Sequence, residues 1–520
     1  MSALHQSAVV AVIGAGAMGA GIAQVAAQAG HPVVLFDAKD GAADSGRAGI
    51  LASLDRSVSK GRLDADERDS IAARLRVATS LADCAPAELV VEAIVESLEV
   101  KRKLFAALED VVKPATILAT NTSSLSVTAI AAQLQHPYRV AGMHFFNPAP
   151  LMALVEIVSG LGTAPDTLDS LFQTALAWGK QPVRTRSTPG FIVNRVARPF
   201  YAEGLRLLEE GAADAPTIDA VIRESGGFRM GPFELMDLIG HDVNFAVTRS
   251  IFEAYFGDPR FRPSLTQQEL VAAGWLGRKA SRGFYDYRDG APKVAARNEE
   301  AGPAPTNVVI EGELGPAESL AQALVAAGIP VERMQGPGYI RIADATLSLT
   351  DGRTATERVS QGEPTDLVLF DLALDYAATP RIAIAAAHQG HSGATAAAAG
   401  LFQVMNKSVS VLGDLPGLVV LRTVAMLTNE AADAVLQAVA TVADIDRAMT
   451  LGVNYPLGPL AWADRIDLGY VLGALDALHL TYGDDRYRAS LLLRQSAAAG
   501  STFHERREGA PAGRPAPATY

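Results

Sequence analysis

Residues 8–37, AVVAVIGAGAMGAGIAQVAAQAGHPVVLFD, decide the fold of the first part of this chain. An apolar run at residues 9–13 predicts a buried β-strand, and the Ala-rich segment 18–29 predicts a helix. A second apolar run at residues 33–36 predicts another strand, which ends at Asp37. The stretch therefore predicts a strand, a tight turn, a helix and a second strand, in that order.

Three glycines, Gly14, Gly16 and Gly19, stand at G-x-G-x-x-G spacing between the first strand and the helix. The first permits the tight turn, the second lets the backbone approach a pyrophosphate, and the third lets helix and strand pack closely. The N–H groups of Ala17 and Met18 in the first helical turn offer donors to phosphate oxygens. A glycine-rich helix start is the alternative explanation, but the flanking strands and the acid that follows favour a dinucleotide site.

Asp37 closes the second strand, where a carboxylate accepts hydrogen bonds from the hydroxyls of the adenosine ribose. The same carboxylate repels the 2′-phosphate of NADP, so we expect NAD as the cofactor. Lys39 nearby is a weak indication of NADP, because a cation could pair with its 2′-phosphate. No metal site is expected.

The composition bounds the class of protein. A chain of 520 residues suggests two to four domains, and the net charge of −12 argues against nucleic acid or an anionic membrane as a partner. The single cysteine, Cys84, excludes an intrachain disulfide and suits a reducing compartment. The chain shows no basic leader and no apolar run long enough to span a membrane. We expect a soluble, cytoplasmic protein.

Strands and helices alternate beyond Asp37, which indicates an α/β, doubly wound parallel sheet of the Rossmann type. The further expected strands are residues 89–94, 116–119, 140–145 and 154–158. We assign residues 1–186 to this NAD-binding domain. Ligands on such sheets bind at the carboxyl ends of the strands, and the polar motifs of the chain follow those ends.

Residues 44–74 have helical spacing and carry Arg56 and Lys60 about one turn apart. The two cations are either part of a solvated face or a landing place for an anionic substrate tail.

Five further regions are expected after the first domain. An all-α domain covers residues 187–288 and opens with one long amphipathic helix over residues 191–210. The remaining regions are a linker at 289–306, a degenerate Rossmann-like domain without the glycine motif at 307–405, a second copy of the helical domain at 406–500 and a disordered tail at 501–520.

An internal repeat supports the second helical copy. Residues 414–469 align with residues 187–240: Pro-Gly opens both, and LGPLAWAD matches MGPFELMD. The second copy has Leu421 where the first has Asn194, and it lacks both the glycine motif and an HFFNP motif. We therefore expect one active site per chain.

His144 and Glu156 are the candidates for acid–base chemistry. His144 ends a buried strand in HFFNP, and Glu156 interrupts the apolar run LVEIV, where an acid is costly unless it is paired. A glutamate next to a histidine orients the ring and stabilises the imidazolium. The alternative is two unrelated groups, with His144 bonded to backbone and Glu156 on a sheet edge.

Three more polar residues follow strands or open helices. Ser123 and Asn121 lie at another strand end, where they either bond a substrate oxygen or cap a helix. Asn194, on the first helix of the all-α domain, either faces the cleft or caps a contact between helices.

The motifs VVEAIVESLEVK, NTSSLS, MHFFNPAPLMALVEIV, TPGFIVNR and GPFELMDLIG, together with the glycine turn, resemble the L-3-hydroxyacyl-CoA dehydrogenase family in order and spacing. The resemblance covers about residues 8–290. The duplicated second half resembles the long bacterial branch associated with phenylacetate degradation and fatty acid metabolism, whose members act on 3-hydroxyadipyl-CoA or 3-hydroxybutyryl-CoA.

The resemblance implies NAD-dependent oxidation of a (S)-3-hydroxyacyl-CoA to the 3-oxoacyl-CoA. It implies that His144 is the general base and that Glu156 orients it. Ser123 and Asn194 match the positions that hold the substrate oxygens. The positions that line the NAD site are matched by Glu96, Lys101 and Asn147.

Other classes of protein stay open. A related β-hydroxyacid dehydrogenase would need a lysine base where Asn194 stands, and a non-enzymatic nucleotide-binding protein on the same fold would be expected to lack His144 or Glu156. We expect a homodimer, in which the second helical copy either extends the contact between chains or packs on the first copy as an internal pseudo-dimer.

Overall fold

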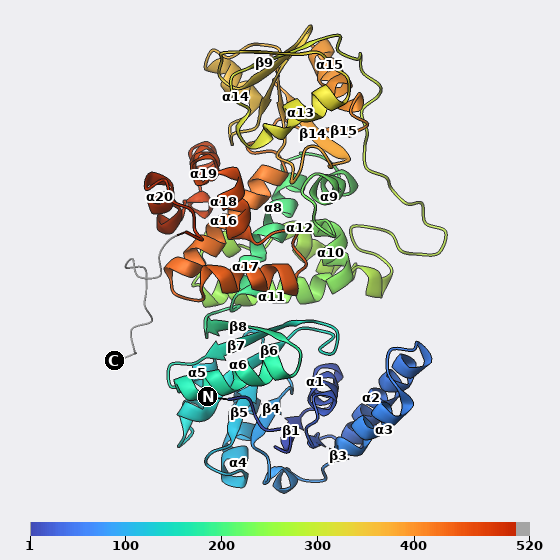
Figure 1. The fold of residues 1–520 in the computed structure, drawn as a ribbon, viewed down its shortest axis with the longest axis vertical. Coiled ribbons are helices and arrows are strands. Elements are labelled where there is room, and N and C mark those ends of the chain that lie inside the picture. Colours follow the sequence, from blue (N-terminus) through green and yellow to red (C-terminus); the bar gives the residue numbers. More distant parts are fainter. Residues whose placement is uncertain (1, 506–520) are drawn as a thin grey trace. The chain divides into compact units, whose positions relative to one another are not determined.

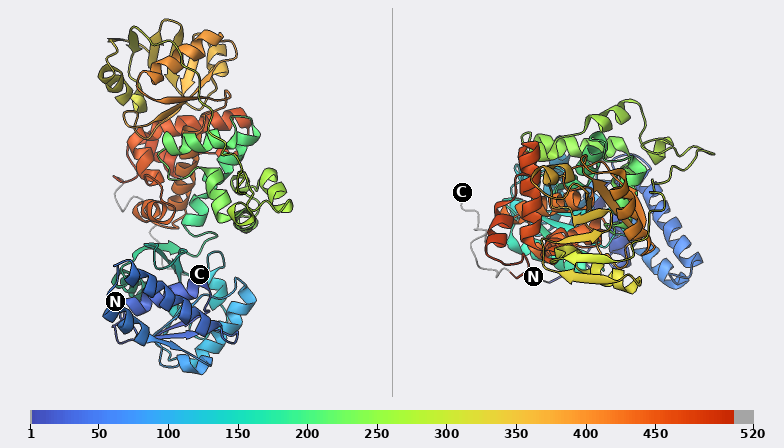
Figure 2. Two further views of the ribbon diagram at one scale, coloured as in Figure 1. Left: turned by 90° about the vertical axis from the view of Figure 1, so that its right-hand side faces the viewer. Right: turned by 90° about the horizontal axis from the view of Figure 1, so that it is seen from above.

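The computed structural model describes residues 2–505. Of these, residues 2–195 and 437–453 form one compact unit, here unit 1, and residues 196–436 and 454–505 form another, unit 2 (Figures 1 and 2). The tail predicted at 501–520 lies outside the described residues from residue 506 onward. No helix in the described part of the chain is long and apolar enough to cross a membrane.

Unit 1 contains a sheet with the strand order β3-β2-β1-β4-β5-β6-β7-β8. Neighbouring strands run parallel except β6 and β7, which are antiparallel. The strands are β1 (Val10–Ile13), β2 (Val33–Phe36), β3 (Leu75–Val77), β4 (Leu89–Glu92), β5 (Ile117–Thr120), β6 (Val140–Phe145), β7 (Leu154–Ser159) and β8 (Gln181–Arg186). This topology confirms the predicted doubly wound Rossmann-type sheet.

The glycine turn joins β1 to α1 (Ala17–Gln28). Gly14 has φ +99°, and a Cβ there would lie 2.5 Å from the carbonyl oxygen of Ala93 on the neighbouring strand connection. At Gly19 a Cβ would lie 1.8 Å from the carbonyl oxygen of Gly14. Only glycine fits at both positions, because no side chain has room there.

Alternate residues of the strands face two separate cores. Val10 and Val12 pack with α1, α2 (Ala42–Ser59), α3 (Ala65–Arg74) and α6 (Pro165–Ala177), whereas Ala11 and Ile13 pack with α4 (Leu98–Val111) and α5 (Val127–Ala131). The period of two in a strand places successive side chains on opposite faces of the sheet. Helices therefore cover both faces, and α2 and α3 lie side by side (Figures 1 and 2).

One helix of unit 1 comes from the second helical copy. α17 (Val442–Gly452) packs against β7 and β8, and the N–H of Arg186 donates to the carbonyl oxygen of Val439 at 2.9 Å. The strand that carries Glu156 is therefore supported by a segment about 290 residues further along the chain.

Unit 2 contains the rest of both helical copies. The first copy contributes α8 (Arg198–Glu209), α9 (Ala215–Glu224), α10 (Pro232–Ile239), α11 (His241–Ala254), the 3₁₀ turn η3 (Pro259–Phe261) and α12 (Leu265–Ala272). The second contributes α16 (Val420–Leu436), α18 (Pro459–Ile466), α19 (Leu468–Tyr482), the 3₁₀ turn η6 (Asp485–Tyr487) and α20 (Leu491–Ala498). α16 packs against α8, so the two copies share one helical core.

The single helix predicted over residues 191–210 is wrong. The structure divides this stretch into the short α7 (Val193–Val196) and α8, with a break at Ala197, and Phe191 has a φ of +47°. Pro199 has no N–H to donate to the carbonyl of the preceding turn, which interrupts the helix there. Met426 stands at the corresponding position of the second copy, where α16 runs unbroken.

A second sheet lies in unit 2 with the strand order β10-β9-β11-β12-β13-β14-β15. Its strands are β9 (Val308–Glu311), β10 (Val331–Met334), β11 (Tyr339–Ile342), β12 (Ala345–Leu349), β13 (Leu367–Phe370), β14 (Arg381–Ala386) and β15 (Ser408–Val411). The helices α13 (Ser319–Ala326), α14 (Ala355–Ser360) and α15 (Ser392–Gln403) accompany it. Because β15 pairs with β14, this sheet extends past residue 405, its expected end.

The two sheets receive equivalent support from the helical copies. α9 of the first copy packs against β14, just as α17 of the second copy packs against β7. The N–H of Gly413 donates to the carbonyl oxygen of Ala212 at 2.8 Å, and these residues align with Arg186 and Val439 in the repeat. Each helical copy thus lends one helix to the sheet that precedes the other copy.

Candidate active site

His144 and Glu156 face each other across the antiparallel pair β6 and β7. His144 Nδ1 lies 2.6 Å from Glu156 Oε2, and both side chains are buried. In this register the two side chains leave the same face of the sheet as direct cross-strand neighbours. The structure therefore brings together the two residues that the sequence singles out for acid–base chemistry.

The second oxygen of Glu156 holds the start of the helical region. Glu156 Oε1 accepts hydrogen bonds from the backbone N–H groups of Ile192 at 3.0 Å and Val193 at 3.1 Å. Both oxygens of this buried carboxylate are thereby satisfied, which offsets the cost of its burial. The same bonds fix the segment that leads into α7 and Asn194.

Two aromatic rings enclose the imidazole. The ring centroid of His144 lies 4.6 Å from that of Phe146 and 5.9 Å from that of Phe191. The positive φ of Phe191 turns the chain at the start of the helical region and brings this ring against the histidine. The rings restrict water around the His144–Glu156 pair, which strengthens their electrostatic interaction.

A cavity of about 330 Å³ opens at the carboxyl ends of the strands. Its wall contains His144, Ser123 and Asn194, the residues matched to substrate chemistry, and Met18 from the first turn of α1. The wall is completed by Glu96, Lys101, Asn121, Asn147 and four apolar or aromatic residues, Ala93, Ile94, Phe145 and Phe146. Residues predicted for the cofactor and for the substrate thus line one space.

Glu96 ties down the loop that carries Ser123. Its Oε1 accepts from Thr122 Oγ1 at 2.5 Å, from the N–H of Ser123 at 3.0 Å and from Ser124 Oγ at 3.0 Å. Burial alone would raise the pKa of Glu96, but these hydrogen bonds and the charge of Lys101 hold that pKa below its ordinary value. The helix-cap explanation for Ser123 is wrong, because the N-cap of α5 is Ser126.

Lys101 joins two carboxylates under this loop. Its Nζ lies 2.6 Å from Glu92 Oε1 and 3.3 Å from Glu96 Oε2, and Thr120 Oγ1 donates to Glu92 Oε2 at 2.7 Å. Glu92 is fully buried at the end of β4. Glu92 is absent from the predicted site residues, although an acid at the end of the apolar run LVVE is the same signal that identified Glu156.

Asn121 has a positioning contact. Its Oδ1 accepts the backbone N–H of Phe145 at 2.8 Å, which joins the ends of β5 and β6. This side chain therefore holds the strand end that carries His144, and it caps no helix.

The glycine turn fits a dinucleotide. A Cβ at Gly16 would meet no protein atom within 4 Å, so open space lies in front of the first turn of α1. Asp37 Oδ2 accepts the N–H of Ala15 at 2.7 Å, and Oδ1 accepts that of Lys39 at 2.9 Å. The carboxylate thus stands beside the turn with lone pairs left for ribose hydroxyls.

Arg56 and Lys60 do not line the cavity. Arg56 lies in the last turn of α2 and Lys60 is its C-cap, and both side chains are exposed. Their predicted part in binding a substrate tail stays a prediction.

Segments of the chain match three domains of known 3-hydroxyacyl-CoA dehydrogenases. Residues 9–188 match the 3-hydroxyacyl-CoA dehydrogenase NAD binding domain, and residues 190–287 and 417–510 match the C-terminal domain of the same enzymes. Residues 347–416 match the 3-hydroxybutyryl-CoA dehydrogenase reduced Rossmann-fold domain.

A sequence relative and a solved structure, both from Escherichia coli, are similar to this chain over most of its length, and a human relative is similar over about half of it. The 3-hydroxyadipyl-CoA dehydrogenase of Escherichia coli K12 is 47% identical over 94% of this chain and 97% of its own length. A crystal structure of 3-hydroxybutyryl-CoA dehydrogenase from the same organism has a TM-score of 0.87 at 46% identity, covering 95% of this chain and 99% of that one. The human mitochondrial hydroxyacyl-coenzyme A dehydrogenase is 41% identical over 54% of this chain and 91% of its own length. The chain belongs to the 3-hydroxyacyl-CoA dehydrogenase family.

Proposed function

We propose that this protein oxidises a (S)-3-hydroxyacyl-CoA to the 3-oxoacyl-CoA with NAD as the oxidant. The observation that carries the proposal is the 2.6 Å contact between His144 and Glu156 in the wall of a cavity that also reaches the glycine turn. The family matches over residues 9–188 and 190–287 support the same reaction.

His144 acts as the general base. Its Nδ1 faces the Glu156 carboxylate, which can only accept a hydrogen bond. The ring proton therefore lies on Nδ1, and Nε2 carries the free lone pair. Nε2 takes the proton of the C3 hydroxyl, and Glu156 stabilises the imidazolium that forms. NAD, when bound, supplies the electrophilic ring that accepts the hydride from C3.

Ser123 and Asn194 orient the substrate. Both side chains line the cavity together with His144, and hydroxyl and amide groups suit the hydroxyl oxygen at C3 and the thioester carbonyl. Holding these oxygens fixes C3 within reach of the base and of the cofactor. Glu96, Lys101 and Asn147 line the same space, and we assign them to the cofactor.

The acyl group is 3-hydroxyadipyl or 3-hydroxybutyryl. The relatives named for these two substrates are similar to this chain over most of its length. An adipyl chain ends in a carboxylate and needs a cation near the acyl end of the cavity, whereas a butyryl chain needs an apolar end.

A substrate panel decides between them and tests the reaction class. We expect NADH formation with 3-hydroxyadipyl-CoA or 3-hydroxybutyryl-CoA to exceed that with 3-hydroxyhexanoyl-CoA, measured as kcat/KM at 340 nm. Absence of NADH formation with all three thioesters would contradict the proposed function.

We also propose a cytoplasmic homodimer that takes part in phenylacetate or fatty acid breakdown. The single cysteine supports a reducing compartment. Light scattering of the full chain tests the assembly: the mass of two chains supports a dimer, and the mass of one chain contradicts it.

A further inference from the structure

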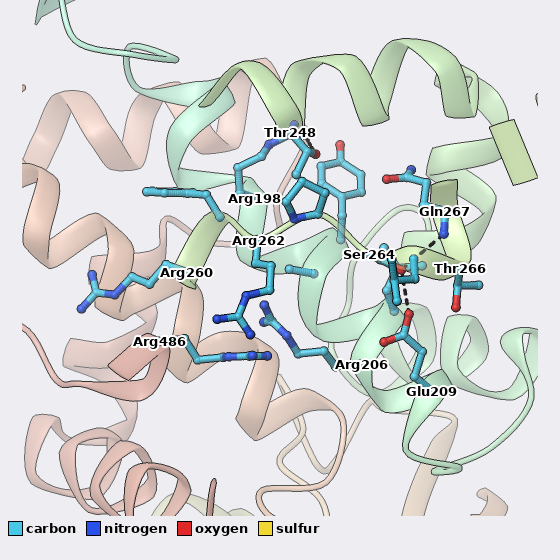
Figure 3. A pocket seen from close by; sticks show the side chains of 16 residues that line it. Arg198, Arg206, Glu209, Thr248, Arg260, Arg262, Ser264, Thr266, Gln267 and Arg486 are labelled. Atoms are coloured by element: carbon cyan, nitrogen blue, oxygen red, sulfur yellow. Dashed lines mark hydrogen bonds between the residues drawn. The ribbon is translucent and has the colours of Figure 1, made fainter. Parts of the chain in front are cut away.

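A cavity of about 480 Å³ lies within unit 2, and it shares no lining residue with the candidate active site. α8, η3 and α12 of the first helical copy and η6 of the second form its wall (Figure 3). Apolar side chains, among them Tyr201, Leu205 and Phe261, line part of it.

Five arginines and one carboxylate line this cavity. The cations are Arg198, Arg206, Arg260, Arg262 and Arg486, and the acid is Glu209, which accepts a hydrogen bond from Ser264 at 2.7 Å. Figure 3 shows the guanidinium groups of Arg206, Arg262 and Arg486 turned toward one another. Cations thus outnumber acids among the lining side chains, although the chain as a whole has a net charge of −12.

The neighbouring carboxylates leave donors unused. Asp484 lies 2.6 Å from Arg486 and only within 4.0 Å of Arg262. Among the described residues, Arg206 donates only to Glu203, through one terminal nitrogen. The remaining N–H groups of Arg206, Arg262 and Arg486 are therefore available to a ligand that supplies acceptors.

The internal repeat explains how the excess charge arises. Residues 257–265, GDPRFRPSL, match residues 483–491, GDDRYRASL, so that Arg260 and Arg486 are equivalent. Arg260 bonds Asp433 on α16. The residue of α8 that aligns with Asp433 is Arg206, and it faces the cavity with Arg486. Arg486 therefore has the cation Arg206 beside it at the position where its equivalent, Arg260, has the acid Asp433.

We propose that this arginine cavity binds a small organic phosphate. Guanidinium groups bind phosphate oxygens bidentately, and three of them around one space offset the charge of a dianion. The volume exceeds that of a phosphate ion, and the apolar wall suits the organic part of the ligand.

The ligand bridges the two helical copies, since its site takes side chains from η3 and from η6. Binding therefore stabilises unit 2 against unfolding by mass action.

Titration calorimetry on the full chain, with the cofactor site saturated by NADH, tests the proposal with inorganic pyrophosphate as the probe. We expect one binding event per chain and a rise in the melting temperature. In the double variant Arg262→Gln/Arg486→Gln we expect at least a tenfold weaker Kd and no rise in melting temperature. Arg488→Gln is the matched control, because it aligns with Arg262 but does not line the cavity.

A second titration tests whether the ligand has an organic part. Adenosine 3′,5′-bisphosphate should bind more tightly than pyrophosphate, and weaker binding would overturn the choice of an organic ligand. Absence of pyrophosphate binding in the wild type, or equal binding in the double variant, would overturn the site itself. Should the double variant fail to fold, the single variant Arg262→Gln is the test, because within residues 2–505 this exposed side chain has an ion pair only with Asp484, at 4.0 Å.

Discussion

Glu156 and Asp371 bind the start of the helical copy in the first and in the second half of the chain, respectively, through equivalent hydrogen bonds. Glu156 accepts the N–H groups of Ile192 and Val193, and Asp371 accepts those of the aligned residues Val419 and Val420 at 2.9 and 2.7 Å. Both acids are buried and anchor the segment in which a helical copy begins. Only Glu156 has a histidine on its second oxygen, so the first half has added chemistry to a structural joint that both halves share.

Substitution of these two acids separates structure from chemistry. Glu156→Gln keeps one acceptor but removes the charge that stabilises the imidazolium, and we expect kcat to fall by roughly 10²-fold or more. Asp371→Asn weakens the equivalent joint and lowers the free energy of unfolding by about 1–3 kcal/mol, with kcat unchanged in the folded protein. Steady-state kinetics and urea denaturation of both variants measure the two effects. A comparable loss of kcat in both variants would contradict the assignment.

Glu96 predicts a pH dependence of stability. Its pKa is lowered in the folded protein, so the carboxylate stabilises the fold above the unfolded-state pKa of about 4.3, and this contribution is lost as the pH falls through the folded-state pKa. We expect Glu96→Gln to be less stable than the wild type by about 1 kcal/mol at pH 7, allowing for partial exposure, and the difference to vanish at the acid end. Urea denaturation between pH 7 and pH 3 measures the difference.

The control for Glu96 is Asp66→Asn, which removes one exposed charge from the first turn of α3. A stability difference between wild type and Glu96→Gln that stays constant across this pH range would argue against the carboxylate as its source.

Gly452 tests whether the second helical copy supports the active site. A Cβ at this end of α17 would lie 2.7 Å from Leu154 Cδ2 and 3.1 Å from Val193 Cγ2. Leu154 is on the same strand as Glu156, and Val193 directly precedes Asn194. Gly452→Leu displaces both side chains, and because small misplacements of catalytic groups are costly we expect kcat to fall roughly tenfold or more. Steady-state kinetics gives the value.

Gly473 provides the matched comparison. It lies on the exposed side of α19, where a Cβ would meet nothing within 4 Å, so Gly473→Leu should leave kcat unchanged. Equal activity of the two leucine variants would show that α17 has no influence on β7.

Arg422 predicts that the helical copies cannot be separated without loss of stability. It is fully buried, bonds Glu203 and Glu210 on the first copy at 2.8 and 2.7 Å, and also bonds Tyr487 at 2.7 Å. Arg422→Met leaves Glu203 buried with one partner fewer, and removing one member of such a pair costs about 3–5 kcal/mol. Arg494→Met, which breaks an exposed pair with Asp476, should cost about 1 kcal/mol or less. Similar losses in both variants, measured by denaturation, would contradict the role of this network.

Local patterns were sufficient to predict the sheet of unit 1, the duplicated helical domain and the family. The glycine turn has its effect within a few residues, and apolar runs such as LVVEAI mark strands without reference to the rest of the chain. The contact of His144 with Glu156 was predictable as a pairing but not from spacing alone, since it depends on the register of β6 and β7.

Long-range features were beyond local patterns. The support of β7 by α17 joins segments about 290 residues apart, and the arginine cavity collects cations from two repeats. The break between α7 and α8, in contrast, has a local cause, because Pro199 is present in the sequence. The strong amphipathic pattern around it nevertheless favours a continuous helix.

The most direct test of the central claim is the variant His144→Gln, compared with the wild type in turnover of 3-hydroxybutyryl-CoA or 3-hydroxyadipyl-CoA and in NADH binding by fluorescence titration. Glutamine has no basic nitrogen to accept the hydroxyl proton, and the substitution leaves the glycine turn, where we propose that the dinucleotide binds, unchanged. We predict that kcat falls by roughly 10²–10⁴-fold, while the Kd for NADH changes by less than about threefold. Turnover within about threefold of the wild type would contradict the account.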